Sequence, residues 1–447
     1  MHVIAVVFSA ALVQASDAVS PDEWRPRLEP YSVERHVFVL RDGLRVVVEQ
    51  HANASAIRVV SRITGGRVAE PAAGAAWHGV DLWRGAAVRP GLDVTTAYAL
   101  VGAGLDITVS PETTLLVVEG PASAAETVLG LERARGSEEW LAVAPDHRSP
   151  SMPAWADERD GAWLGPLFDA IYPEEHPYNG MYGTGSSREH AEAWIRTTWR
   201  PDRTTVVVSS PLAPRRVLCS LVGAEACLTD VLGARPVEAE HVVSADLDAA
   251  PAGGSELWMR PLSPPRSTDL EHARFPVASP VLLVGWSGPG SDARLGGLPV
   301  EQFVDAGVRW VEDQLRDAIS EDHVRRTRCW WIDGDASGTT VCALFLRHGA
   351  PIDRVGRRVT RGVGTRGLAE HLEAWRGRAR ADSISALDDP SGAVQLATHF
   401  ARTGRTTLHT DRLDAVNAVD LEILRSMVLS VYGPRRAARV LVEDARE

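Results

Sequence analysis

The sequence contains no lysine, so all 47 of its basic residues are arginine. A bias that extends to every basic position indicates the base composition of the source genome, not a function. Cysteine is scarce as well, because only Cys219, Cys227, Cys329 and Cys342 occur and none forms a Cys-x-x-Cys pair. This spacing argues against a zinc ribbon or a disulfide scaffold. Cys219 and Cys227 could form a disulfide or be two buried small hydrophobic residues, and we favour the second interpretation.

Other absences narrow the range of functions. After the N-terminus no apolar stretch is long enough to span a bilayer, so no integral membrane segment is expected. The sequence has no Gly-x-Ser-x-Gly nucleophile elbow and no phosphate-binding glycine loop. The net charge is -12, and no stripe of basic and aromatic residues interrupts it. A nucleic-acid partner is therefore not expected, since phosphate-binding proteins usually carry a basic surface.

An apolar run opens the chain. Val3 to Val13 is followed by small residues through Ala18, which is typical of an export signal with a short hydrophobic region. No arginine precedes the run, and the alternative interpretation is a buried first strand. We predict a signal peptide at residues 1–18 and a periplasmic or extracellular location.

The rest of the chain predicts two α/β halves of similar size. A chain of 447 residues is too long for one ordinary core. "VFVLRDGLRVVVEQ" predicts a hairpin that turns at Asp42-Gly43, and "AIRVVSRITGG" predicts a further strand. The stretch Gly74 to Trp83 predicts a helix, and "AGLDITVSPETTLLVVEG" predicts two strands joined near Ser110-Pro111. The second half repeats this plan, with the strand "SPVLLVGWSG" and the long helix "PVEQFVDAGVRWVEDQLRDAI". We predict an internal duplication with domains at 36–235 and 256–447 and a linker at 236–255.

The two predicted strand regions before and after Gly74 to Trp83 are followed by "HPYNGMYGT" and "WIRTTWRPDRTTVVV". In this order and spacing the three segments resemble the pitrilysin/insulinase family of zinc metallopeptidases, which includes mitochondrial processing peptidase. The first, "LRDGLRVVVEQHANASAIRVVSRITGGRVAEP", is similar to the hairpin and exposed strand that precede the family's metal-binding helix. The second, "AGLDITVSPETTLLVVEG", is similar to the family's Gly-x-Asn-Ala-x-Thr strand pair. The third is "HPYNGMYGT" followed by "WIRTTWRPDRTTVVV", and the second half from "SPVLLVGWSGPG" resembles the family's non-catalytic repeat.

The resemblance covers nearly the whole chain after the predicted signal. It implies an α+β fold with two homologous domains, each a mainly antiparallel sheet flanked by helices. Chains of this family commonly pair to enclose a chamber that holds unfolded peptide segments. The partner implied here is an active subunit of the same family or a second copy of the chain.

Active members carry His-x-x-Glu-His on a helix, because residues at i and i+4 share one face and bring both histidines to one zinc ion. The intervening glutamate activates the zinc-bound water. In one register Trp77 and Asp81 fall on the two histidines and Val80 on the glutamate. In the other His78 matches the first histidine, Asp81 the glutamate and Leu82 the second histidine. Neither register supplies two histidines.

The third ligand of the family, a glutamate on a downstream helix, also has no match. Here that region is the proline-broken "APDHRSPSMPAWADERD". Counting back from His176 places the ligand at Ser151, whereas matching "ERD" to the family's triplet places it at Gly165 with Glu158 as its support. Glu158 is the nearby substitute, and His147 is a further metal-binding residue type in the same stretch.

Two positions are candidates for a peptide groove. Asp106 stands where the family's strand-edge asparagine usually lies. Arg316, in "QLRDAI", matches an arginine that holds the substrate backbone in many bacterial relatives, and it is equally compatible with a solvated helix. The tyrosine that accompanies this arginine has no counterpart between His323 and Arg326.

These observations favour a non-catalytic homologue that pairs with an active zinc peptidase and forms half of its peptide chamber. Zinc belongs to the active relatives, and no cofactor is expected here. One alternative is a divergent metalloendopeptidase with an atypical metal site built around His78, Asp81, His147 and Glu158. The other is a structural or assembly subunit.

Overall fold

A computed structural model describes residues 34–135, 140, 162–229, 231–237 and 264–445, with gaps at 52, 184–185, 276, 292, 296–297, 320, 335–336, 362, 389–390, 405, 407 and 434–435. The predicted signal peptide, most of the predicted linker, His147 and Glu158 lie outside these residues. The predicted domain boundaries therefore remain predictions.

The first half is built on a seven-stranded sheet in the order β6-β7-β3-β8-β2-β1-β9. All neighbouring strands are antiparallel except β2 and β8, which run parallel. The strands are β1 (Glu34–Leu40), β2 (Arg45–Gln50), β3 (Ala56–Thr64), β6 (Gly104–Val109), β7 (Thr113–Pro121), β8 (Thr204–Ser210) and β9 (Val231–Val237).

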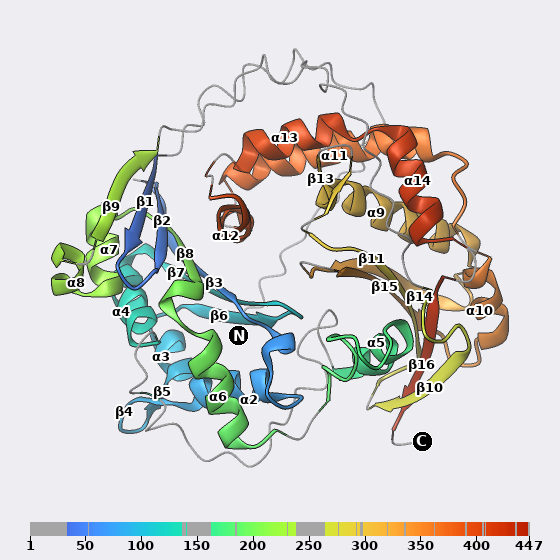
Figure 1. Ribbon diagram of the computed structural model, residues 1–447, viewed down its shortest axis with the longest axis horizontal. Coiled ribbons are helices and arrows are strands. Elements are labelled where there is room, and N and C mark those ends of the chain that lie inside the picture. Colours follow the sequence, from blue (N-terminus) through green and yellow to red (C-terminus); the bar gives the residue numbers. More distant parts are fainter. Residues whose placement is uncertain are drawn as a thin grey trace, which may run out of the picture.

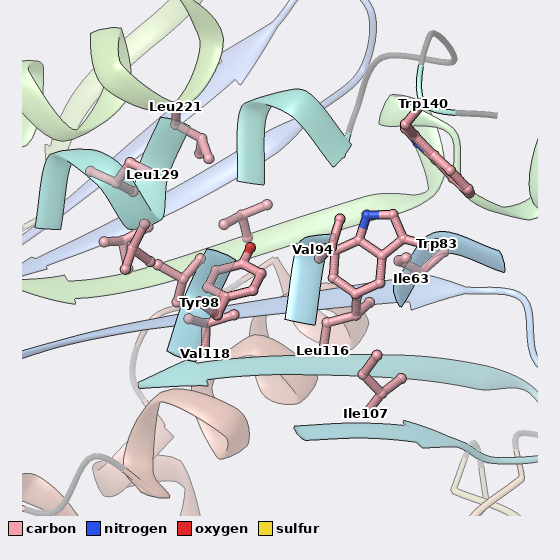
Figure 2. Close-up of a cluster of buried hydrophobic side chains, with 14 of the residues drawn as sticks. Ile63, Trp83, Val94, Tyr98, Ile107, Leu116, Val118, Leu129, Trp140 and Leu221 are labelled. Carbon is pink, nitrogen blue, oxygen red and sulfur yellow. The ribbon is translucent and has the colours of Figure 1, made fainter. Parts of the chain in front are cut away.

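Helices cover one face of this sheet. They are α2 (Ala75–Gly85), α3 (Val94–Leu100), α4 (Ala125–Arg135), α6 (Arg188–Thr198), α7 (Pro214–Val222) and α8 (Ala224–Thr229), and a short hairpin of β4 (Ala87–Arg89) and β5 (Leu92–Asp93) joins α2 to α3. The core between sheet and helices is aromatic and β-branched, and Figure 2 shows Trp83 among Ile63, Val94 and Leu116. Alternate residues of each strand point into this core, as the period of two requires.

The second half is built on a five-stranded sheet in the order β10-β16-β11-β15-β14. Its strands are β10 (Leu270–Phe275), β11 (Val281–Pro289), β14 (Val324–Ile332), β15 (Ser337–Leu346) and β16 (Ala438–Asp444). Its helices are α9 (Val300–Ala318), α10 (Ile352–Thr360), α11 (Leu368–Asp388), α12 (Ser391–Thr403), α13 (Leu408–Ala418) and α14 (Leu421–Val431), and a two-stranded ribbon of β12 (Arg294–Leu295) and β13 (Leu298–Pro299) precedes α9.

The two sheets have the same internal plan. From the edge inward, β6-β7-β3-β8-β2 corresponds to β14-β15-β11-β16-β10. In both series the first three pairings are antiparallel and the last, β8 with β2 or β16 with β10, is parallel. This agreement in order and direction confirms the predicted α+β architecture of two mainly antiparallel sheets flanked by helices, and it is what an internal duplication produces.

One helix of each half packs on the sheet of the other half (Figure 1). Helix α5 (Gly165–Ile171) belongs to the first half of the sequence but packs on β11, β15 and β16 of the second sheet. The approach is close, because a Cβ atom on Gly285 of β11 would lie 2.6 Å from Cδ1 of Ile171. The Tyr172 hydroxyl then bonds Oγ1 of Thr339 in β15 at 2.8 Å.

The exchange is reciprocal. Helix α12 of the second half packs on the face of the first sheet that the helices of that half leave bare. Val37, Val47, Val60 and Val207 form a stripe across four strands, and Leu396, Ala397 and Phe400 of α12 cover it. Neither half therefore completes its own core without the other.

Several local predictions are confirmed and others fail. The hairpin at Asp42-Gly43, the helix after Gly74 and the strand pair around Ser110-Pro111 are all present. The strands β9, β10 and β14 and the helices α10 and α13 were not predicted. Among the described residues no helix combines the length and apolarity needed to cross a membrane.

The favoured interpretation of the cysteines was wrong. Cys219 of α7 is disulfide-bonded to Cys227 of α8, because the left-handed Gly223 between the helices turns the chain and brings the two Cα atoms to 4.9 Å. Cys329 of β14 is bonded to Cys342 of β15, which lies directly opposite in the antiparallel register. All four cysteines are paired.

Candidate functional site

Helix α2, which resembles the family's metal-binding helix, begins at an unusual cap. Gly74 has a left-handed φ of 88° and offers no side chain to the first turn. The Glu70 carboxylate replaces that side chain, since it accepts hydrogen bonds from the Gly74 N–H at 2.8 Å and the Ala76 N–H at 2.9 Å. An anionic acceptor at a helix N-terminus satisfies free N–H groups and complements the helix dipole.

Close packing against α6 fixes the orientation of α2. A Cβ atom on Gly79 would lie 2.9 Å from the indole of Trp194 and 3.1 Å from Ile195, so only glycine fits this crossing. The Trp194 Nε1–H donates to the Gly66 carbonyl at 3.0 Å and ties α6 to the loop that follows β3. The side chains of α2 thus have defined positions.

In the first register the metal-facing positions carry a stacked cation–aromatic contact. Trp77 is 6% exposed, and the Arg67 guanidinium carbon lies 5.6 Å from its ring centroid and 4.2 Å from that of Tyr182. Arg67 is itself only 2% exposed. A guanidinium held on aromatic faces places a positive charge beside the helix without any metal ligand. Val80, at the position of the general base, is fully buried and has no proton to exchange.

In the second register one potential ligand is kept. His78 is 3% exposed, and its Nδ1 lies 3.3 Å from the Ser186 carbonyl oxygen and 3.2 Å from the Ser186 Oγ. Its Nε2 is buried and has no hydrogen-bond partner among the described residues. Leu82, at the second histidine position, is 1% exposed and packs in the hydrophobic core, whereas Asp81 is half-buried.

The described residues do not fit the zinc ion of the family. No group of three or more His, Cys, Asp or Glu side chains in the described part of the chain is close enough together to hold a metal ion. Helix α2 offers one imidazole, that of His78, and one carboxylate, that of Asp81, whereas hydrolytic zinc requires three protein ligands and an open position. His147 and Glu158, the other predicted contributors, are outside the described residues.

A buried acidic group elsewhere in the first half is structural. Glu132 is 3% exposed and accepts hydrogen bonds from the Tyr98 hydroxyl at 2.8 Å, Arg135 Nε at 3.0 Å and Ser61 Oγ at 3.2 Å. Burial, together with this carboxylate, raises the pKa of Tyr98 well above its usual value. The polar atoms satisfy one another, so this cluster ties β3, α3 and α4 together and leaves no group free to react.

The strand β6 presents an open edge. It ends the seven-stranded sheet and pairs only with β7 among the described strands. The Ser110 N–H donates to the Thr113 carbonyl at 2.8 Å, which fixes the phase of the ladder, so the backbone groups of Leu105 and Ile107 point away from β7. Arg67 Nε donates to the Val109 carbonyl at 3.3 Å and closes the end of this edge next to α2.

The corresponding edge in the second half is covered. Helix α9 has 19 residues and α2 has 11, although both follow the equivalent strand. The extra turns of α9 reach over β14, where the Glu312 carboxylate accepts the backbone N–H of Cys329 at 3.1 Å. Because α2 stops at Gly85, it does not extend over β6 as α9 extends over β14, and among the described strands β6 pairs only with β7.

The two predicted groove residues lie in different surroundings. Asp106 is exposed on β6, opposite Val117 of β7, and no described residue hydrogen-bonds or pairs with it. Arg316 is 57% exposed on α9 and pairs with Glu312 at 2.6 Å and Asp313 at 3.3 Å. Arg316 therefore has the contacts of a solvated helix arginine.

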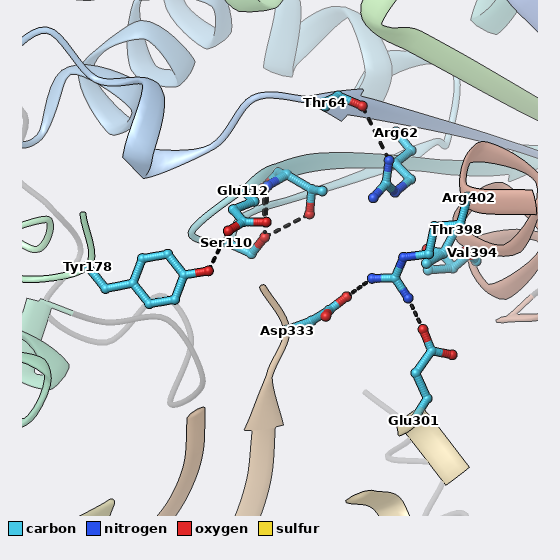
Figure 3. A network of polar contacts seen from close by, with 11 residues as sticks. Arg62, Thr64, Ser110, Glu112, Tyr178, Glu301, Asp333, Val394, Thr398 and Arg402 are labelled. Atoms are coloured by element: carbon cyan, nitrogen blue, oxygen red, sulfur yellow. Dashed lines mark hydrogen bonds and ion pairs between the residues drawn. The ribbon is translucent and has the colours of Figure 1, made fainter. Parts of the chain in front are cut away.

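The two hairpin tips next to β6 and β14 are tied to the exchanged segments (Figure 3). The Tyr178 hydroxyl donates to Glu112 in the β6–β7 turn at 2.5 Å and also lies against Gly334 in the β14–β15 turn. Arg402 of α12 pairs with Glu301 at the start of α9 and with Asp333 beside β14. The Tyr178 contacts thus join the β6–β7 turn to the β14–β15 turn, and the Arg402 ion pairs hold α12 on the second half.

The sequence did not single out Arg67, Tyr178 or Tyr182. The feature of the sequence that could have identified Arg67 is its position directly after Gly65-Gly66, in the loop that leads to α2. The His-Pro-Tyr segment acts in packing, as its one histidine stacks on Tyr172 with ring centroids 4.2 Å apart. Burial lowers the pKa of His176.

The fold is that of two-domain M16-like peptidases, as the comparison with solved structures shows. No protein-family model matches the sequence, and no curated protein matches it either. Solved structures do match. An M16-like peptidase from Alicyclobacillus acidocaldarius is 16% identical with a TM-score of 0.62, and the match covers 92% of this chain and 99% of that one.

Two further structures widen the comparison. An M16 peptidase domain from Pseudomonas fluorescens, described as inactive, is 12% identical with a TM-score of 0.58, covering 92% of this chain and 98% of that chain. The periplasmic protease PqqL from Escherichia coli is 13% identical with a TM-score of 0.56, covering 92% of this chain and 45% of PqqL. Identities this low establish the shared fold and leave the activity of this chain to be inferred from its own residues.

Proposed function

We propose that this chain is a non-catalytic M16-like subunit that holds extended peptide segments. One observation carries the proposal: the helix that should bind the metal has a tryptophan beneath a buried arginine and a leucine in the core, while the strand edge beside it is open. Helix α2 does not supply the metal ligands that hydrolysis needs, whereas the edge of β6, which would hold a peptide backbone, is open.

The mode of binding follows from the exposed backbone groups. An extended peptide can add to a free sheet edge through main-chain hydrogen bonds, which makes the binding tolerant of sequence. Leu105 and Ile107 each offer an N–H and a C=O at this edge. The covered edge of β14 offers no equivalent site.

The proposal includes pairing with an active M16-like subunit, which would supply the metal and the hydrolysis. A second copy of this chain is the other candidate partner. The similarity to a domain described as inactive supports a role without catalysis. Purification from the native source tests the pairing, and recovery of the chain with no peptidase subunit would contradict it.

Peptide binding is tested on the purified full chain by hydrogen exchange with and without an unfolded peptide. We expect slower exchange of the Leu105 and Ile107 amides and no change in β14. Leu105→Pro removes one outward N–H without touching the β6–β7 ladder and should weaken binding about tenfold, since one backbone hydrogen bond and the neighbouring ladder are lost. Leu105→Ala is the matched control for the side chain. Equal binding by both variants would overturn the proposal.

A second candidate function, a divergent metalloendopeptidase, is favoured by the geometry of His78. A histidine that ligates a metal usually donates from one ring nitrogen to a backbone carbonyl, which aims the other at the ion. The Nδ1 of His78 faces the Ser186 carbonyl, and its Nε2 is buried without a described partner. Metal analysis of the chain purified alone distinguishes the two functions. Stoichiometric zinc, with peptide cleavage abolished by His78→Ala, would establish the second.

We also propose that the chain works in an oxidising compartment, in agreement with the export signal predicted from the sequence. The two disulfides support this location, because such bonds persist in the periplasm and outside the cell and are rare in the cytosol.

A further inference from the structure

The open edge of β6 carries one charge that no neighbour compensates. Asp106 is exposed, and its side chain lies on the face opposite Ile107 and Val109, which point into the core with α2 and α3. Across the ladder it faces Val117, and Thr108 beside it faces Leu115. The immediate surroundings of the carboxylate are therefore neutral.

The other charged side chains on this face are already paired or bonded. Arg58 of β3 forms an ion pair with Glu119 of β7 at the far end of the hairpin. Arg62 is 5% exposed and donates to Thr64 Oγ1 at 3.4 Å. No described cation pairs with Asp106, so its carboxylate is available to a side chain of a strand that adds to β6.

A strand added to this edge would bond to the backbone of Leu105 and Ile107. The added residue between those bonds forms a non-hydrogen-bonded pair with Asp106, which is the closer type of cross-strand pair. Its side chain lies on the same face as the carboxylate. This placement is the same for every added strand in register with the edge, because the backbone bonds of Leu105 and Ile107 fix the phase.

We infer that Asp106 selects peptide segments with an arginine or lysine at the position opposite it. The inference rests on the proposed function, since it concerns the strand that β6 would hold. It names the substrate class: extended segments that carry an arginine or lysine at the position opposite Asp106. Opposite charges on directly paired strand residues attract, and like charges repel.

The test uses fluorescence anisotropy on the full chain with three labelled peptides, Ser-Thr-Val-Thr-Xaa-Thr-Val-Thr-Ser, where Xaa is Arg, Gln or Glu. We expect the Arg peptide to bind about fivefold tighter than the Gln peptide and the Glu peptide to bind weakest. Asp106→Asn should bring the three affinities together, and Asp106→Arg should reverse their order. Both substitutions are at an exposed position, so folding is not at risk.

The matched control is Glu126→Gln, which removes the same charge from an exposed position on α4, on the other face of the sheet. It should keep the order Arg, Gln, Glu. An order that survives Asp106→Asn, or that Glu126→Gln abolishes equally, would overturn the inference while leaving strand addition standing. Failure of all three peptides to bind would overturn the proposed function and this inference together.

Discussion

The reciprocal exchange of segments predicts that one leucine of the second half stabilises the sheet of the first. Leu396 of α12 is fully buried against the valine stripe that includes Val60 and Val207. Leucine-to-alanine changes in cores cost about 2–5 kcal/mol, depending on how far the cavity collapses. Here the cavity wall is a sheet whose strands are hydrogen-bonded on both sides, so little collapse is available. We expect Leu396→Ala to lower the free energy of unfolding by about 3 kcal/mol.

Native-state hydrogen exchange measures this effect by position. A loss of about 3 kcal/mol should accelerate the slowest amides roughly 150-fold, since every 1.4 kcal/mol is a factor of ten. The acceleration should appear in β3 and β8, far from residue 396 in sequence, and not only in α12. Leu429→Ala is the control, because Leu429 is in α14 and is 52% exposed. If hydrogen exchange accelerates in α12 alone, α12 does not stabilise the first sheet, and the argument that the two halves complete each other's cores fails.

Three further outcomes are expected. Gly79→Ala should lower the stability by about 1–3 kcal/mol by overpacking α2 against Trp194, whereas Gly130→Ala, in open space on α4, should raise it by about 0.5–1 kcal/mol. Thermal unfolding followed by fluorescence measures both, and equal effects would refute the packing argument. Burial lowers the pKa of His371, so its native state favours the neutral form. The stabilisation is complete above the unfolded pKa of about 6.5 and is lost as the pH falls through the lower folded pKa. His371→Gln should therefore flatten the fall of the unfolding free energy over that acidic range, and an unchanged slope would contradict this. Alkylation of the denatured, non-reduced protein from an oxidising compartment should label none of the four cysteines, and labelling of any pair would show that its disulfide is absent.

The sequence predicted the elements with strong local signals. Asp42-Gly43 marks a hairpin because a left-handed glycine suits a tight turn, and the long helix after residue 300 shows a clear 3.6-residue period. The strand β14 was missed because "VRRTRCWWI" has three arginines and an edge strand need bury only part of one face. The exchange of α5 and α12 could not be predicted from local sequence, because the apolar face of a helix does not specify which of the two sheets it will pack on.

The candidate site was predictable in part. The helix around Gly74 to Trp83 was predicted and is present, and Asp106 was expected at a strand edge, where it lies. The two registers of the metal motif remain predictions. The stacking of Arg67 on Trp77 and Tyr182 was not predictable, because it depends on the meeting of three segments. The Cys329–Cys342 disulfide was missed for the same reason, because the register of β14 with β15 decides it, whereas the Cys219–Cys227 disulfide was considered and not favoured.

The packing of α5 on the second sheet and of α12 on the first has the geometry of a domain swap within a single chain. A lone copy of either repeat would leave an apolar stripe of its sheet in water, and only a second copy could cover it. Joining two copies end to end keeps the partner at a high effective concentration at any dilution. Each copy is then free to diverge, and the unequal lengths of α2 and α9 are one such difference between the two repeats.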